Sequence, residues 1–308
     1  MAIANYSLGV VQLGVEATAG TAVAATEIWR GLVSYPDDDR TRNAANEEIG
    51  LLVPDERTYD TKLGAKLQLP ATEATFEQLP HILEAGIMTA TPTGAGPYVY
   101  SYTFPLATTF NTINTYTLRC GNAIATSDFT VVPYGFVTEF ELSGKSGEAW
   151  MVTSTWMGQQ LTSGTPTAAL SPLSVQPLIF ANSLLFIDAS GGTIGTTQYT
   201  GVLREFSIRV QTGVKPVEPG DGTLYYIDHW FDRPTVEFSM TLALDSANTN
   251  VSTQRTQFSD NNVQLIRVQT PGSASRDATI DFAARIDKVN PYKKLGDGST
   301  GVQFDGHA

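Results

Sequence analysis

Apolar and polar residues alternate with a period of two along much of this chain, and that pattern constrains its fold more than any other feature. In the longest run, residues 235–244, every second position is apolar: Val236, Phe238, Met240, Leu242 and Leu244. Shorter runs lie at 62–69, 137–142, 150–156, 202–210 and 279–286. Because successive side chains of a strand point to opposite faces, each run predicts a strand with one buried face. We therefore expect a mainly β protein with antiparallel sheets.

One flanking α-helix is predicted beside these strands. Thr75 and Gln78 have the spacing of a capping box at a helix start. They lead into an apolar face at helical spacing, which consists of Phe76, Leu79, Ile82 and Leu83. Pro80 falls past the first turn if Thr75 is the cap, so the helix either starts later or is kinked there. A second, weaker helical stretch is predicted at about 252–260.

The predicted elements follow one another in the same order twice. Residues 61–142 read strand, helix, strand, strand, and residues 235–286 repeat that order. Antiparallel proteins that mix strands and helices can also give this order by chance. We favour a duplication, which divides the chain into a first unit at 61–165, a linker or insertion at 166–200, a second unit at 201–290 and a polar C-terminal tail at 291–308.

The first sixty residues are acidic and show little alternation between Pro36 and Thr58. They contain ten Asp and Glu residues against four Lys and Arg residues. We predict that residues 1–60 form an N-terminal arm and a long acidic loop that orders against a neighbouring molecule. The run Asp37-Asp38-Asp39 lacks the alternating spacing of a calcium loop, which favours a solvated loop over a cation site.

The overall charge and the single cysteine limit the possible partners and compartments. The net charge of −12 would repel nucleic acid at long range. Charged residues make up only 16% of the chain, which indicates either surfaces hidden by partners or polar faces rich in Thr and Ser. Cys120 alone allows no intrachain disulfide. No leader pattern and no run of about 20 apolar residues is found, so we expect synthesis in a cytoplasm and no membrane span.

Residue patterns for catalysis or cofactor binding are weak. Gly144-Lys145-Ser146 imitates the end of a phosphate-binding loop, but Glu139 stands where that loop needs a glycine. The three histidines have no metal-ligand spacing. Cys120 could pair with His81 as a thiol nucleophile, yet its position in a strand favours a packed cysteine. We expect no enzyme activity, no cofactor and no metal.

Four segments resemble phage tail-tube proteins. Residues 13–23, LGVEATAGTAV, resemble the opening of many members of that family. Residues 75–83 resemble the family's helix after its first long strand, residues 116–122 its central strand, and residues 137–144 its hairpin. The likeness runs in order over most of the chain, although each motif is short. We therefore identify the chain by resemblance as a major tail-tube protein of long-tailed, siphovirus-type bacteriophages.

The resemblance implies a β-sandwich or barrel tube domain with a flanking helix, here duplicated. Family members join sheets side by side into rings with a closed barrel lumen, and the rings stack into a tube that carries DNA into the host. For this chain we expect a homotrimeric, pseudo-hexameric ring, with a homohexamer as the alternative. A tape-measure protein, a tail terminator and distal tail proteins are the other implied partners, and the virion tail is the implied location.

The resemblance also suggests contact residues. Candidates for contacts between stacked rings are Asp37, Asp38, Asp39, Arg40, Arg42, Glu47 and Glu48. Candidates for sheet edges or the lumen are Glu139, Glu141, Glu205, Ser207, Thr235, Glu237, Ser239 and Thr241. An acidic lumen would let DNA slide without specific binding. Two alternatives stay open: another tail protein such as a terminator or distal tail protein, and a carbohydrate-binding adhesin that uses Trp150, Trp156, Trp230, Tyr98, Tyr100 and Tyr102.

Overall fold

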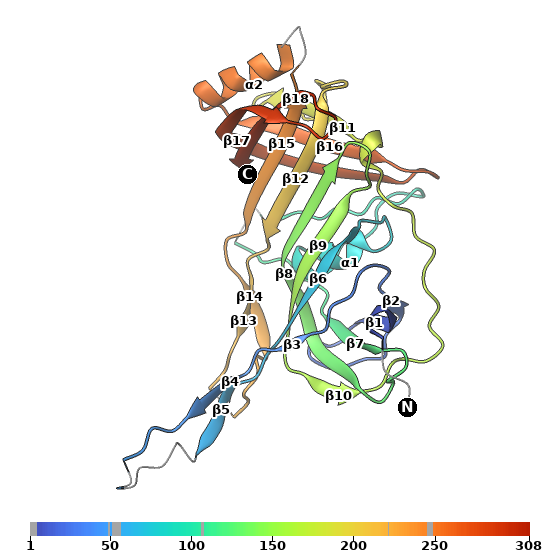
Figure 1. Cartoon of the computed structure of the whole chain (residues 1–308), viewed down its shortest axis with the longest axis vertical. Coiled ribbons are helices and arrows are strands. Elements are labelled where there is room, and N and C mark those ends of the chain that lie inside the picture. The colour runs from blue at the N-terminus through green and yellow to red at the C-terminus, as the bar shows by residue number, and fades with distance from the viewer. Residues whose placement is uncertain (1–4, 49, 51–56, 106–107, 221, 245–248) are drawn as a thin grey trace.

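The chain folds into two sandwich-like units that share one continuous antiparallel sheet (Figure 1). The computed structural model describes residues 5–48, 50, 57–105, 108–220, 222–244 and 249–308. The predicted class is confirmed, because antiparallel strands dominate and a helix flanks the sheet of each unit. No sheet of the described residues closes on itself as a barrel.

The first unit is built around the long strand β8. Its main strands are β1 (Gly9–Val15), β6 (Ala65–Glu73), β7 (Tyr116–Asn122), β8 (Phe129–Lys145) and β9 (Met151–Gly158). They pair in the order β1–β7–β8–β9–β6. β8 belongs to both layers, since its first half pairs with β7 and its second half with β9. Short strands extend the edges: β2 (Glu27–Ile28), β3 (Asp37–Asp38) and β10 (Thr162–Gly164).

The second unit repeats this arrangement around the long strand β17. Its strands are β11 (Leu184–Ala189), β12 (Leu203–Gln211), β15 (Thr235–Ala243), β16 (Gln264–Pro271), β17 (Asp277–Lys294) and β18 (Thr300–His307). They pair in the order β11–β16–β17–β18–β15, and β12 lies beside β15 as β3 lies beside β6. The strand–helix–strand–strand order predicted twice from the sequence is therefore present twice. β18 lies within residues 291–308, for which we expected a polar tail.

The two helices occupy matching places, each between the equivalent strands of its unit. α1 (Leu79–Gly86) packs on β8 and α2 (Thr249–Ser259) packs on β17. α1 starts later than the capping-box spacing indicates, because Pro80 is accommodated in the first turn. The hydroxyl of Thr75 still accepts a 3.2 Å hydrogen bond from the amide of Gln78.

Each unit also has a hairpin just before its equivalent strand. β4 (Thr41–Ala44) and β5 (Thr58–Lys62) precede β6, whereas β13 (Val214–Val217) and β14 (Asp228–Phe231) precede β15. Figure 1 shows the β4–β5 hairpin projecting away from the rest of the molecule. Part of the predicted acidic loop, at 41–44 and 58, therefore belongs to the strands of a hairpin, and residues 49 and 51–56 of that prediction lie outside the described residues. β1, within the same first sixty residues, is paired along its whole length with β7.

The apolar faces of both units meet in one extended core. Trp156 is fully buried between the layers of the first unit, and the ring of Trp150 lies 5.0 Å from that of Phe180 and 6.0 Å from that of Phe206. Phe206 belongs to β12, so the core continues from one unit into the other. Both the core packing and the strand pairing therefore cross the junction between the units. The side chains of β8, β12 and β15 that point away from this core form one long polar face.

Candidate assembly surface

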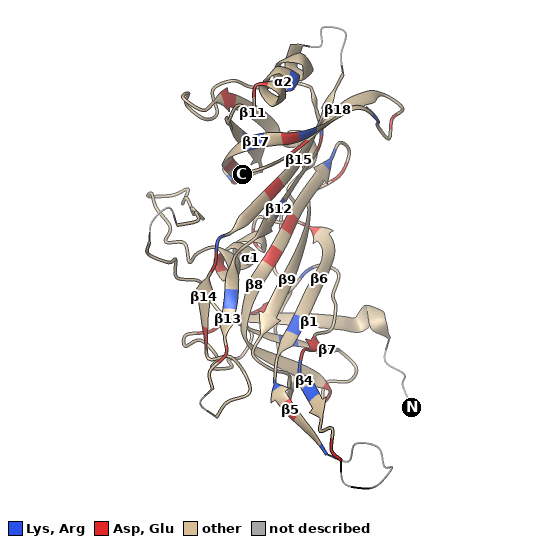
Figure 2. Cartoon of the chain, turned by 90° about the vertical axis from the view of Figure 1, so that its left-hand side faces the viewer, with Lys and Arg blue, Asp and Glu red and all other residues tan. Residues whose placement is uncertain are grey.

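The structure brings the eight predicted lumen residues together on one face of three neighbouring strands. Glu139 and Glu141 come from β8, Glu205 and Ser207 from β12, and the other four from β15. Their register aligns them in rows across the sheet: Glu141 with Arg209 and Glu237, and Ser207 with Ser239. Figure 2 shows acidic positions along this part of the sheet.

Ion pairs and hydrogen bonds tie this polar face together. The guanidinium of Arg209 lies 2.8 Å from the carboxylate of Glu139. The hydrogen bond to Glu139 and the charges of Glu139, Glu237 and Glu141 raise the pKa of Arg209. Ser239 donates a 2.6 Å hydrogen bond to Asp305 from β18. Arg209 therefore pairs with one carboxylate, that of Glu139. Because Glu141 and Glu237 also lie near Arg209, the surface around it stays acidic.

A second carboxylate on this face, Glu205, is held from two sides. The Thr241 hydroxyl donates a 3.1 Å hydrogen bond to it, and the ammonium of Lys293 from β17 reaches the same oxygen. Thr241 is itself buried, at 1% exposure. Of the predicted lumen residues, Thr241 is thus placed to support the sheet and not to face a passing molecule.

The predicted ring-to-ring residues fall into two different places. Asp37 and Asp38 form β3 at the exposed edge of the sheet beside β6, and Asp39 follows them. Arg40, Arg42, Glu47 and Glu48 belong to the projecting hairpin and are exposed. The predicted ring-to-ring residues therefore form two groups, one at the edge of the sheet and one on the hairpin.

The hairpin is cross-linked by its own charges. Asp60 on β5 binds Arg42 at 2.7 Å and Arg40 at 3.3 Å, and Glu47 pairs with Arg57. The hydrogen bond from Arg42 and the charges of both arginines lower the pKa of Asp60, against a smaller opposing effect of burial. These pairs keep the described part of the hairpin in register while leaving its sides polar.

Two buried carboxylates lock matching turns, and sequence reasoning missed both roles. Glu16 accepts hydrogen bonds from the Gly20 amide, the hydroxyls of Thr115 and Thr117, and the Tyr134 amide, all at 2.8–2.9 Å. Tyr134 has a φ of +57° at the point where β8 changes layer. The segment LGVEATAGTAV gave a local signal for Glu16, but three of its four partners lie more than ninety residues away.

The counterpart in the second unit is Asp188 on β11. It accepts hydrogen bonds from the amides of Gly195, Thr196 and Thr197 at 2.8–3.1 Å. Burial raises the pKa of this carboxyl, but the hydrogen bonds to Thr197, Thr196 and Gly195 outweigh it and lower the pKa. In both units a carboxylate after or near the end of the first strand fixes a Gly-Thr turn.

One cluster superficially resembles a catalytic arrangement. His81 on α1 contacts Glu27 at 2.7 Å and the Tyr116 hydroxyl at 3.1 Å, and that hydroxyl lies 3.3 Å from Glu84. Burial, followed by the charge of Glu84, raises the pKa of Tyr116 far above its usual value. Tyr116 therefore stays protonated at neutral pH and makes a poor nucleophile. The cluster pins α1 to β2 and β7.

Other candidate sites from the sequence are also explained by packing. Burial raises the pKa of the Cys120 thiol to about 12, so that thiol is inert at neutral pH. Trp150 and Trp156 are core residues, which removes them as sugar platforms, whereas Trp230 is 44% exposed on its hairpin. Within the part of the chain that the structure describes, no group of three His, Cys, Asp or Glu side chains could hold a metal ion.

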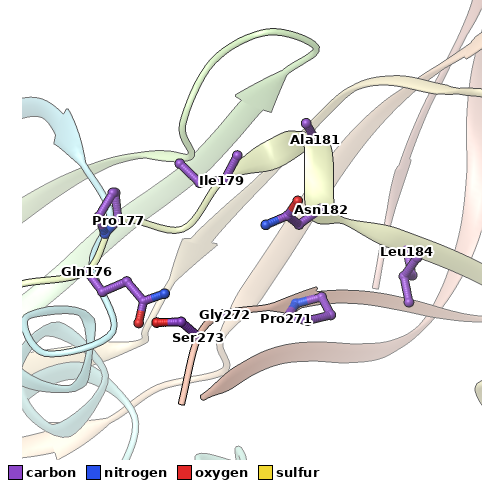
Figure 3. Close-up of a pocket in the computed structure, with 9 residues that line it drawn as sticks. All are labelled: Gln176, Pro177, Ile179, Ala181, Asn182, Leu184, Pro271, Gly272 and Ser273. Atoms are coloured by element: carbon purple, nitrogen blue, oxygen red, sulfur yellow. The ribbon is translucent and has the colours of Figure 1, made fainter. Parts of the chain in front are cut away.

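A shallow hollow lies where the segment before β11 meets the β16–β17 turn (Figure 3). Its lining is neutral and consists of Gln176, Pro177, Ile179, Ala181, Asn182, Leu184, Pro271, Gly272 and Ser273. General acid–base chemistry needs a titratable group, and the lining offers none. Among the described residues, no helix is both long and apolar enough to cross a bilayer.

Comparison with known protein families gives a match over nearly the whole chain. Residues 7–305 match the model of the family described as phage tail tube protein. The match takes in both units, the linker between them and the projecting hairpin. No curated protein matched the chain.

Proposed function

Since the chain belongs to the phage tail tube protein family, a structural family of the virion tail, we propose that three copies form a ring and that stacked rings make the tube through which DNA leaves. One observation carries the trimer: each chain contains the same strand order twice, with the two units already joined edge to edge through β8 and β12. Three such chains supply six equivalent units. Six single-unit positions filled by three chains give a pseudo-hexameric ring.

The polar face of the shared sheet is the surface we assign to the lumen. Its opposite face is used by the core, so this polar face is the side of the sheet left to meet a water-filled lumen. Carboxylates such as Glu141 and Glu237 repel phosphate, while the ion pairs of Arg209 and Lys293 moderate that repulsion. DNA would therefore pass without being held. The projecting β4–β5 hairpin is the part we assign to contact with the next ring.

Electron microscopy of the purified protein tests this function. We expect tubes whose end-on averages show six similar lobes with true threefold symmetry. Six identical lobes in a ring of six chains would overturn the trimer. Single rings that never stack, even with a tape-measure protein present, would indicate a terminator or a distal tail protein instead, and monomers under every condition would count against any ring.

A further inference from the structure

The two long strands can be matched residue by residue as far as Asn290, because one irregularity coincides; the second register shift of β17, between Asn290 and Lys293, has no counterpart in the β8–β9 pairing. β8 and β9 pair through Val137 and Trp156, then skip one residue of β8 before Glu139 pairs with Thr155. β17 and β18 pair through Ile286 and Gly306, then skip one residue of β17 before Lys288 pairs with Asp305. The extra residue therefore stands at the same point of both long strands. Glu139 of the first unit matches Lys288 of the second.

The strands at the outer edge of each unit can be matched in the same way. Asp37 of β3 pairs with Lys66, which lies opposite Met157 of β9. Arg209 of β12 pairs with Glu237, which lies opposite His307 of β18. Since Met157 and His307 occupy equivalent positions, Asp37 of the first unit matches Arg209 of the second.

The two long strands differ in what covers their second halves. β12 pairs along β8 from Glu139 to Lys145, so β8 has strands on both sides there. β17 pairs with β18 on one side of this half, and no described strand pairs with its other side. Asp287, Lys288, Asn290 and Tyr292 are exposed, with Tyr292 at 71%. An unpaired strand edge presents free backbone donors and acceptors, which is a template for a further strand; in this half of β17, Pro291 has no backbone donor and its carbonyl oxygen accepts a 3.3 Å hydrogen bond from Arg255.

The strand that matches β12 is β3, and β3 likewise has a single neighbour among the described strands, β6. Within one chain, the edge of β8 is already occupied, because β12 pairs with it. We propose that β3 of a second copy binds antiparallel along the free edge of β17, in the register that β12 uses on β8. This interface rests on the ring proposed above and would repeat the internal junction between chains.

The charges at the matched positions support this pairing. In the internal junction Arg209 of β12 holds Glu139 of β8 at 2.8 Å. At the new interface Asp37 takes the place of Arg209 and Lys288 takes the place of Glu139, so the same ion pair forms with its signs exchanged. In the same register Asp39 lies directly opposite Lys288, which brings a second carboxylate of the acidic run to the same ammonium group.

The exchange of signs also separates the right partner from the wrong ones. β12 placed on β17 would bring Arg209 against Lys288, and β3 placed on β8 would bring Asp37 against Glu139. Like charges placed together at an interface disfavour it and so add specificity. Each edge therefore accepts only its own partner strand, which keeps the order of units around a ring fixed.

Charge reversal tests the interface. Asp37→Lys and Lys288→Asp should each raise the protein concentration needed for ring formation by about tenfold or more, while the double variant should recover most of the wild-type value. Asp260→Lys, an exposed reversal at the end of α2, is the matched control and should leave assembly unchanged. Failure of the double variant to recover, with its monomer folded by circular dichroism, would overturn the ion pair.

A mixture of the two single variants separates the interface from the proposed stoichiometry. In a mixed ring, a contact is favourable only between unlike variants. Three chains cannot alternate around a ring, so one contact keeps like charges and the mixture should stay impaired. Six chains can alternate, and full recovery by the mixture would support the interface while overturning the trimer.

Disulfide cross-linking locates the strands directly. The internal pair Gln211 and Glu139 predicts that Asp39 lies opposite Lys288 of the next chain. Asp39→Cys with Lys288→Cys should cross-link under oxidation into covalent dimers and trimers, and native Cys120 is buried and contributes little background. Asp39→Cys with Thr279→Cys, on the half of β17 that pairs with β16, should not. Rings that form without cross-linking of the first pair would overturn the interface and leave the tube function standing.

Discussion

The two units share one topology, but their long strands lie in different surroundings. Glu139 and Glu141 of β8 are half-buried between β9 and β12, whereas the matched Lys288 and Asn290 of β17 are exposed at an open edge. A repeated fold therefore does not mean repeated surfaces. The pairing of strands is the same in both units, and the residues at the edges of the two units differ according to what they meet.

Matched positions of the two units also differ inside the core, and a substitution there should cause the largest loss of stability. Trp156 of β9 is fully buried, and the matched position of β18 is Gly306. Trp156→Ala should lower the free energy of unfolding by about 3–5 kcal/mol, because it leaves a large cavity. Urea unfolding measures this loss. Trp230→Ala, at a half-exposed tryptophan, serves as the control, and an equal loss there would contradict the assignment of Trp156 to the core.

A substitution at Gly306 should lower the free energy of unfolding by nearly as much, because it would add atoms where there is no space for them. A Cβ atom at this position would lie 2.0 Å from the carbonyl oxygen of Arg285 and 2.7 Å from the ring of Phe238. Gly306→Ala should therefore cost about 1–3 kcal/mol through overpacking, in the same urea assay. Gly296→Ala has open space around it and is the control. A neutral Gly306→Ala would show that the matched positions are not packed as described.

The matched carboxylates give the next effect. Glu16→Gln and Asp188→Asn should each cost about 1–3 kcal/mol, because an amide group would turn a donor toward backbone or hydroxyl donors. The pKa of Asp188 is lowered in the folded state. Its contribution is present above the ordinary aspartate pKa of about 3.9 and is lost as the pH falls through the folded value. Acid titration of stability should thus be shallower below about pH 4 in Asp188→Asn; an unchanged slope would contradict this role.

The smallest effect is expected at the hairpins. Asp60→Asn removes the negative charge that pairs with Arg42 and Arg40, and Asp232→Asn removes the one that pairs with Lys215 on the other hairpin. These pairs are exposed and screened by salt, so neither change should shift the melting temperature of the monomer measurably. If the β4–β5 hairpin contacts the next ring, Asp60→Asn should weaken stacking and Asp232→Asn should not. Sedimentation of tubes measures the difference.

Local patterns predicted much of this fold. The run at 235–244 corresponds to β15, and the strand–helix–strand–strand order predicted at 61–142 and 235–286 is present in both places. β18 was not predicted, because Gly301 and Gly306 interrupt its alternation of apolar and polar residues. β3 was not predicted either, because its acidic residues are typical of a loop. The pairing of β12 with β8, and the partners of Glu16, join residues far apart in the sequence, and periodicity carries no information about such pairs.

The internal junction also has a consequence for how fast and how completely rings could close. Association sacrifices the translational and rotational freedom of every molecule that joins. β12 and β8 belong to the same chain, so their junction would form as the monomer folds, without an encounter between two molecules. In a three-chain ring, half of the junctions would form in this way. A ring of three chains would then need two bimolecular associations, where six separate units would need five, and incomplete rings would have fewer ways to stall.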